Sequence, residues 1–157
     1  MFQLSAEAQN AVKKELTRYE SKDSAIIPSL YIAQKENKGW ISTEVIRHLS
    51  ELMDIPESKI AEVFKFYTMF NQKPVGKFHV QVCTNISCAV NGSRELAVHI
   101  CKELDAKFGE VSKDGRFTVS KVECLGSCGT APMMQVNDKY YESLTPESAM
   151  NILRGMK

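Results

Sequence analysis

The sequence lacks both a long apolar run and a surplus of charge of one sign. No stretch approaches the roughly 18–20 consecutive apolar residues that a membrane-spanning helix requires, so direct membrane insertion is not expected. The net charge at pH 7 is only +1 over 157 residues. Such a balance provides no cationic footprint for nucleic acid or for an anionic membrane surface.

Two further absences restrict the location of the protein and its cofactors. The N-terminal segment MFQLSAEAQNAVKKEL lacks the basic start and apolar stretch of a secretory signal, and we therefore expect a cytoplasmic protein. Neither G-x-G-x-x-G nor G-x-x-x-x-G-K-[ST] occurs, so the chain shows no sign of a nucleotide or flavin site. In a reducing cytoplasm, five cysteines favour metal binding or catalysis over disulfides.

The N-terminal half has the apolar periodicity of helices. Four segments are indicated, with the inward faces Ala8, Ala11, Val12, Leu16 and Tyr19; Ile27, Leu30 and Tyr31; Val45, Ile46, Leu49, Leu52 and Met53; and Ile60, Val63, Phe64 and Tyr67. Ser24 is the expected N-cap of the second helix, and Ser42 or Thr43 that of the third. The run NQKPVGK then breaks the pattern, which predicts a helical domain over residues 1–73 and a second domain over 74–157.

In the second half of the chain, the spacing of apolar residues changes from that of helices to that of strands. Phe78, Val80 and Val82 alternate with polar residues, as in a half-buried strand that ends at Cys83. A helix capped by Ser93 follows, and then come three strand-like runs, RFTVSKVE, MMQV and KYYE, and a final helix opened by Pro146. This order predicts a sheet with helices packed on it, of the α+β or α/β class.

The third and fourth helices also have the arrangement of a DNA-binding helix-turn-helix. From Ile41 to Phe70, however, the sequence has three basic side chains against five acidic ones. DNA recognition depends on a cationic surface, so we do not expect a nucleic-acid partner.

Four of the five cysteines follow strand-like runs or lie in expected loops, as Cys83 and Cys88 in CTNISC and Cys124 and Cys128 in ECLGSCGTAP. Cys101 instead falls on the inward side of a helix, where a free cysteine behaves as a small core residue. The other four are candidate metal ligands.

The spacings C-x4-C and C-x3-C help to distinguish the kinds of site that the four cysteines could form. A thioredoxin-type dithiol requires C-x-x-C at a helix N-terminus, and structural zinc sites generally use C-x-x-C as well, so both fit poorly. No cysteine is followed two residues later by histidine, which removes the usual Rieske pattern. Four thiolates that include a C-x4-C pair favour a [2Fe–2S] cluster, while zinc stays open as the alternative.

The loop composition suits an anionic cluster. Gly126 and Gly129 let backbone N–H groups approach sulfur closely, and a tight turn is the simpler explanation of both. Hydroxyl groups could add donors, from Thr84, Ser87, Ser127 and Thr130. Each N–H···S contact raises the reduction potential of such a cluster.

Two long segments, FYTMFNQKPVGKFHVQVCTNISC and VECLGSCGTAPMMQVNDKYYESLTPE, are similar to the family of 24-kDa subunits of respiratory NADH:quinone oxidoreductase (complex I). The resemblance extends into the helical half through SLYIAQKENKGWIS. It implies a small helical domain followed by a thioredoxin-like ferredoxin domain with one [2Fe–2S] cluster. The family's ligand positions fall on Cys83, Cys88, Cys124 and Cys128, and Cys101 has no place among them. Only the fold relates this family to thioredoxin, so no catalytic residue is expected.

The resemblance also implies partners. The family binds a flavoprotein subunit that carries FMN, the NADH site and a [4Fe–4S] cluster, within the peripheral arm of a membrane-bound complex. The chain would then be an oxidoreductase subunit without turnover of its own. Ser87 stands where many members have proline, and Ser127 where alanine is usual; neither change removes a ligand. The alternatives are the equivalent diaphorase subunit of an NAD-linked hydrogenase or formate dehydrogenase, and a zinc-stabilised scaffold subunit.

Overall fold

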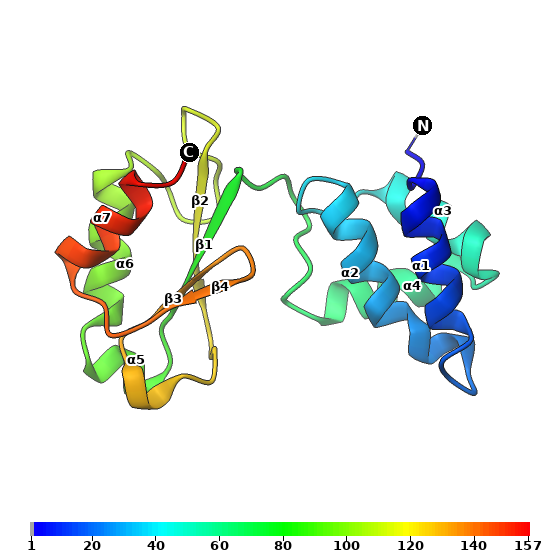
Figure 1. Ribbon diagram of the computed structural model, residues 1–157, viewed down its shortest axis with the longest axis horizontal. Coiled ribbons are helices and arrows are strands. Elements are labelled where there is room, and N and C mark those ends of the chain that lie inside the picture. Colours follow the sequence, from blue (N-terminus) through cyan, green and yellow to red (C-terminus); the bar gives the residue numbers. More distant parts are fainter. Residues whose placement is uncertain (1) are drawn as a thin grey trace. The chain divides into compact units, whose positions relative to one another are not determined.

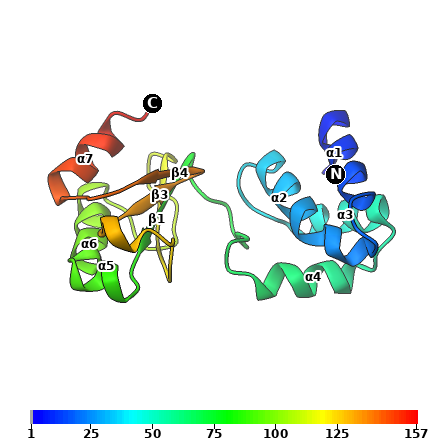
Figure 2. The same cartoon turned by 60° about the horizontal axis from the view of Figure 1, so that its bottom comes forward.

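Helices build the first of the two units into which the chain divides, Met1–Pro74 and Val75–Lys157; the computed structural model describes residues 2–157. They are α1 (Ala6–Leu16), the short 3-10 helix η1 (Lys22–Ala25), α2 (Ile26–Glu36), α3 (Thr43–Met53) and α4 (Glu57–Phe66), shown in Figures 1 and 2. Their apolar faces enclose one core, whose fully buried members include Val12, Leu30, Val45, Leu49 and Ile60. The apolar spacing predicted each of these five.

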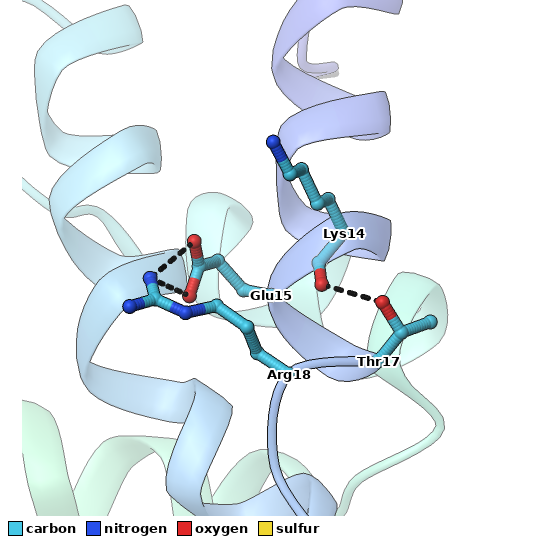
Figure 3. Close-up of polar contacts among 4 residues, drawn as sticks. All are labelled: Lys14, Glu15, Thr17 and Arg18. Atoms are coloured by element: carbon cyan, nitrogen blue, oxygen red, sulfur yellow. Dashed lines mark hydrogen bonds and ion pairs between the residues drawn. The ribbon is translucent and has the colours of Figure 1, made fainter.

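The first helix ends earlier than its apolar spacing predicted. Tyr19, expected on the inward face, lies beyond the end of α1 and is exposed. The Thr17 hydroxyl donates a hydrogen bond of 2.8 Å to the Lys14 carbonyl oxygen, an acceptor that a longer helix would have used (Figure 3). Arg18 pairs with Glu15 at 3.1 Å beside it, an exposed contact that adds little stability.

Helix capping was predicted correctly for α3 and wrongly for α2. The Ser42 hydroxyl accepts a hydrogen bond of 3.3 Å from the Val45 backbone N–H, as expected. Ser24 is not an N-cap, because it lies inside η1. The capping role there belongs to Ser21, whose hydroxyl accepts from the Asp23 backbone N–H at 3.3 Å. Ser21 thus caps η1, whereas α2 itself begins at Ile26, and its N-cap Ala25 makes no side-chain capping hydrogen bond.

The second unit is a four-stranded sheet with helices packed on one side (Figures 1 and 2). Its elements are β1 (Phe78–Cys83), α5 (Ile86–Val90), α6 (Ser93–Glu103), β2 (Phe117–Val122), the 3-10 helix η2 (Cys128–Thr130), β3 (Met134–Val136), β4 (Lys139–Tyr141) and α7 (Pro146–Arg154). The strand order is β2-β1-β3-β4, with β1 and β2 parallel and the other two pairs antiparallel. All four expected strands are present.

The core of the second unit lies between the sheet and the pair α6 and α7. Val80 and Val119 from the parallel strands, Ile100 from α6 and Leu153 from α7 are all fully buried in it. Cys101 is buried in the same cluster, which confirms the prediction that it is a core residue.

Gly76 lies where a side chain cannot fit. A Cβ atom there would stand 2.7 Å from the carbonyl carbon of Phe117 and 2.8 Å from that of Arg116. Backbone atoms at the start of a buried strand cannot move aside cheaply. We expect Gly76→Ala to lower the free energy of unfolding of the second unit by about 1–3 kcal/mol, the usual cost of overpacking.

Gly155→Ala is the matched control, because its added Cβ would meet only the carbonyl oxygens of Asn151 at 3.4 Å and Ile152 at 3.5 Å. Urea unfolding, with amide hydrogen exchange at β1 and β2 as the local measure, distinguishes the two variants. Equal stability of the two would contradict the steric argument.

Candidate metal centre

Parallel pairing brings the first cysteine of each pair to one edge of the sheet. Cys83, the last residue of β1, lies opposite Val122, the last residue of β2. The Thr84 backbone N–H donates to the Val122 carbonyl oxygen at 2.9 Å and continues the pairing one residue further. Cys124 follows two residues after Val122. The carboxyl ends of the two strands therefore deliver Cys83 and Cys124 to the same place.

The second cysteine of each pair is held by a short helical turn. Asn85 caps α5 by accepting a hydrogen bond of 2.7 Å from the Ile86 backbone N–H, and Cys88 lies on that helix. Cys128 opens η2. The sequence predicted a loop at Cys88, and this was wrong: five residues without Pro or Gly form a helical turn that is too short to show a period.

The four cysteines line one cavity of about 160 Å³. Cys83 and Cys88 are 3% and 2% exposed, and pack on the fully buried Met133, whereas Cys124 and Cys128 are exposed to solvent. Cys101 belongs to the separate core under the sheet. The fold thus brings together the four candidate ligands that the sequence singled out and separates the fifth cysteine from them.

The cavity wall is uncharged. Among the described residues that line it, none is Asp, Glu, Lys, Arg or His. Burial, helped by a hydrogen bond with Cys83, raises the pKa of the Cys88 thiol to about 11. A thiolate at that position therefore needs the positive charge of a metal to be stable at neutral pH.

Backbone geometry supplies one donor to sulfur. Gly126 adopts a φ of +76°, a conformation that favours glycine, and its N–H donates to the Cys124 sulfur at 3.4 Å. Both expected uses of Gly126, a turn and a close N–H···S contact, are therefore present. Gly129 does not have a positive φ.

Three of the four hydroxyls expected near sulfur donate to oxygen atoms instead. The Thr84 hydroxyl donates to the Val122 carbonyl oxygen at 3.2 Å. The Thr130 hydroxyl donates to the Glu142 carboxylate at 2.6 Å, and the Ser127 hydroxyl donates to the same carboxylate oxygen. Nothing local to the cysteine motif signals Glu142, which follows β4 and reaches the loop only in the folded chain.

The arrangement of the sulfurs bears on the kind of metal centre. Within residues 2–157, no three His, Cys, Asp or Glu side chains converge as a single metal ion would require. A structural zinc ion needs four ligands at tetrahedral positions about one point. In a [2Fe–2S] cluster each iron binds only two of the four thiolates, because the cluster contains two metal atoms. Four cysteines around one cavity provide the four thiolates that such a cluster requires.

Residues 12–157 match the family of thioredoxin-like [2Fe-2S] ferredoxins. The chain belongs to this family. It is 47% identical over 135 residues to a subunit of the NADH-quinone oxidoreductase of Rickettsia bellii, covering 85% of this chain and 80% of that protein. For the corresponding protein of Rickettsia prowazekii the identity is 46%, covering 80% and 71%.

A solved structure shares the fold at lower identity. The NAD+-reducing [NiFe]-hydrogenase in its air-oxidized state superposes with a TM-score of 0.68 and 21% identity, over 80% of this chain and 22% of the hydrogenase chain. Family membership confirms the expected fold class and identifies the cofactor as a [2Fe–2S] cluster. The uncharged cavity with four thiols suits that group.

Removal of iron tests how far the cluster orders its loops. The residues around the cavity have little apolar burial of their own, so metal binding should supply part of their folding free energy. We expect amide hydrogen exchange to increase over residues 84–91 and 125–131 after iron is removed by chelation, while β1, β2 and α6 stay protected. Loss of protection throughout the second unit would show instead that the whole unit needs the cluster to fold.

Proposed function

We propose that the chain is the electron-transfer subunit of an NADH:quinone oxidoreductase (complex I) and holds one [2Fe–2S] cluster beside a flavoprotein subunit. One observation carries the proposal: four cysteines line a single cavity in a chain that is 47% identical, over most of both proteins, to a subunit of an NADH-quinone oxidoreductase. The chain is thus an oxidoreductase subunit, and its own part of the reaction is the transfer of electrons.

We assign the four ligands to Cys83, Cys88, Cys124 and Cys128. The cluster, when bound, takes up and releases one electron at a time. The chain fixes the thiols at the ends of two paired strands, covers two of them from solvent and directs the Gly126 N–H at a sulfur. A preformed ligand set of this kind keeps the geometry of the site similar in both oxidation states.

The electron must come from another chain. The sequence has neither of the glycine-rich nucleotide motifs, so we place FMN, the NADH site and a [4Fe–4S] cluster on the partner flavoprotein. The isolated chain would then neither bind nor oxidise NADH. We regard residues 1–73 as a helical domain that supplies much of the contact and residues 74–157 as the thioredoxin-like [2Fe–2S] domain.

The run FKFYTMF gives that contact a candidate anchor. Phe64 and Phe70 are buried in the helical core, but Phe66 is 77% exposed and Tyr67 packs edge to face against it, with ring centroids 5.0 Å apart. Exposed aromatic side chains are enriched among interface anchors. We therefore propose that Phe66 contacts the flavoprotein.

The proposed location follows from the complex. Among the helices that the structure describes, none has the length and apolar character needed to cross a bilayer. We propose a cytoplasmic position in the peripheral arm of a membrane-bound complex, with further subunits making the attachment. The fold shared with an NAD+-reducing hydrogenase supports the alternative of a diaphorase subunit in a hydrogenase or formate dehydrogenase. The relatives of higher identity favour complex I.

Cysteine substitution tests the ligand assignment. Replacing any of the four assigned cysteines by alanine should abolish or greatly destabilise the cluster, because one iron loses a thiolate. Cys101→Ala is the matched control and should leave the visible and EPR spectra unchanged, at a packing cost of about 1–2 kcal/mol. An intact reduced-state EPR signal in Cys124→Ala would refute the assignment, and a colourless wild-type protein containing zinc would favour the scaffold alternative.

Co-expression with the flavoprotein tests whether that partner supplies the electrons and whether Phe66 contacts it. We expect a stable complex, NADH-dependent cluster reduction only in that complex, and binding weakened by roughly tenfold or more in Phe66→Ser, as for an interface anchor. Val98→Ser is the control, since Val98 is also exposed but lies on α6 of the other unit. Reduction of the isolated chain by NADH, or undiminished binding of Phe66→Ser, would contradict the proposal.

A further inference from the structure

The end of β4 and the residues that follow it bind the second ligand loop. The Tyr140 hydroxyl donates to the Leu125 carbonyl oxygen at 2.9 Å. Two residues after Glu142, the Leu144 backbone N–H donates to the Pro132 carbonyl oxygen, also at 2.9 Å. We call residues 140–144 the brace, because they bind the loop that carries Cys124 and Cys128 at both of its ends.

Glu142 occupies the middle of the brace. One of its carboxylate oxygens accepts hydrogen bonds from the hydroxyls of Ser127 and Thr130, which flank Cys128 on either side. The two hydroxyls also contact each other at 2.8 Å. These two hydrogen bonds lower the pKa of the Glu142 carboxyl, so the acceptor is ionised at neutral pH.

We propose that Glu142 is a positioning residue for the cluster, which fixes the turn around Cys128 and keeps two hydroxyl donors away from the ligand sulfurs. The proposal rests on the assignment of Cys124 and Cys128 as ligands. Its consequence is a lower reduction potential than the loop sequence by itself would give.

The direction of the effect follows from the chemistry of the donors. Ser127 lines the cavity together with the four cysteines, so this residue belongs to the wall of the site. A donor that points at a thiolate stabilises the extra electron of the reduced cluster and raises the potential. A carboxylate binds a hydroxyl proton more strongly than a neutral acceptor does, and it keeps both hydroxyls turned outward. The exposed charge of Glu142 is itself screened by solvent.

The potential of the full-length chain tests this role, measured by a redox titration followed by EPR. Glu142→Ala should raise the potential, because the freed hydroxyls become available to sulfur, and the triple variant Glu142→Ala, Ser127→Ala, Thr130→Val should reverse most of that rise. Glu142→Gln keeps an acceptor oxygen and should fall between wild type and Glu142→Ala. Glu147→Gln removes an exposed carboxylate of α7 and should leave the potential unchanged.

A second measurement does not need the cluster. In the iron-free chain, amide exchange over residues 125–131 should be faster in Glu142→Ala than in wild type, and unchanged in Glu147→Gln. An unchanged potential in Glu142→Ala, a rise that survives in the triple variant, or unchanged exchange would each overturn the proposal. Cluster loss in Glu142→Ala with retention in Glu142→Gln would support it. A wild-type chain that binds no [2Fe–2S] cluster would refute the proposed function, whereas the exchange comparison would still decide whether Glu142 holds the loop.

Discussion

The parallel pairing of β1 with β2 is the constraint on which the metal centre depends. Parallel strands end at the same edge of a sheet, and the register that sets Cys83 opposite Val122 determines where both cysteine pairs emerge. A slip of one residue would turn every side chain of one strand to the other face. The apolar residues Val80 and Val119, fully buried and paired in this register, resist such a slip. The core of the second unit thus specifies the position of ligands that are not part of it.

The electrostatics of the cavity couple metal binding to the state of its thiols. An uncharged wall with two buried cysteines disfavours free thiolates. The pKa of Cys88, raised to about 11, reflects this penalty on the charged form of the thiol. Binding iron therefore displaces protons from the thiols and contributes free energy to the ordering of the loops. The resulting cluster is anionic, so each hydrogen-bond donor at sulfur both stabilises it and raises its reduction potential. Gly126 supplies one donor, and Glu142 takes two others away.

Sequence patterns predicted those features that depend on local periodicity or on ligand chemistry. Most of the buried faces of α1 to α4, the four strands and the separation of Cys101 from the other cysteines follow from the spacing of apolar residues. Tyr19, Tyr31 and Tyr67 were also expected to face inward, and this was wrong, because all three are exposed. Five-residue α5 was missed because it is shorter than two helical turns. The hydroxyl acceptors were missed for a different reason. Ser127 and Glu142 are fifteen residues apart, and only the β3–β4 hairpin and its return to the loop bring them together.

The two cysteine pairs differ in burial, and this difference fits the work of an electron carrier. A fully buried centre would be stable but distant from any redox partner, and electron transfer weakens steeply with distance. A fully exposed one would be open to water and oxidants. Here Cys83 and Cys88 are anchored beside Met133 in an apolar wall, while Cys124 and Cys128 stand on an exposed loop. The exposed loop has little burial to order it, so the order must come from polar contacts. The brace of residues 140–144 provides them, and this is why a carboxylate outside the ligand motif bears on the properties of the metal centre.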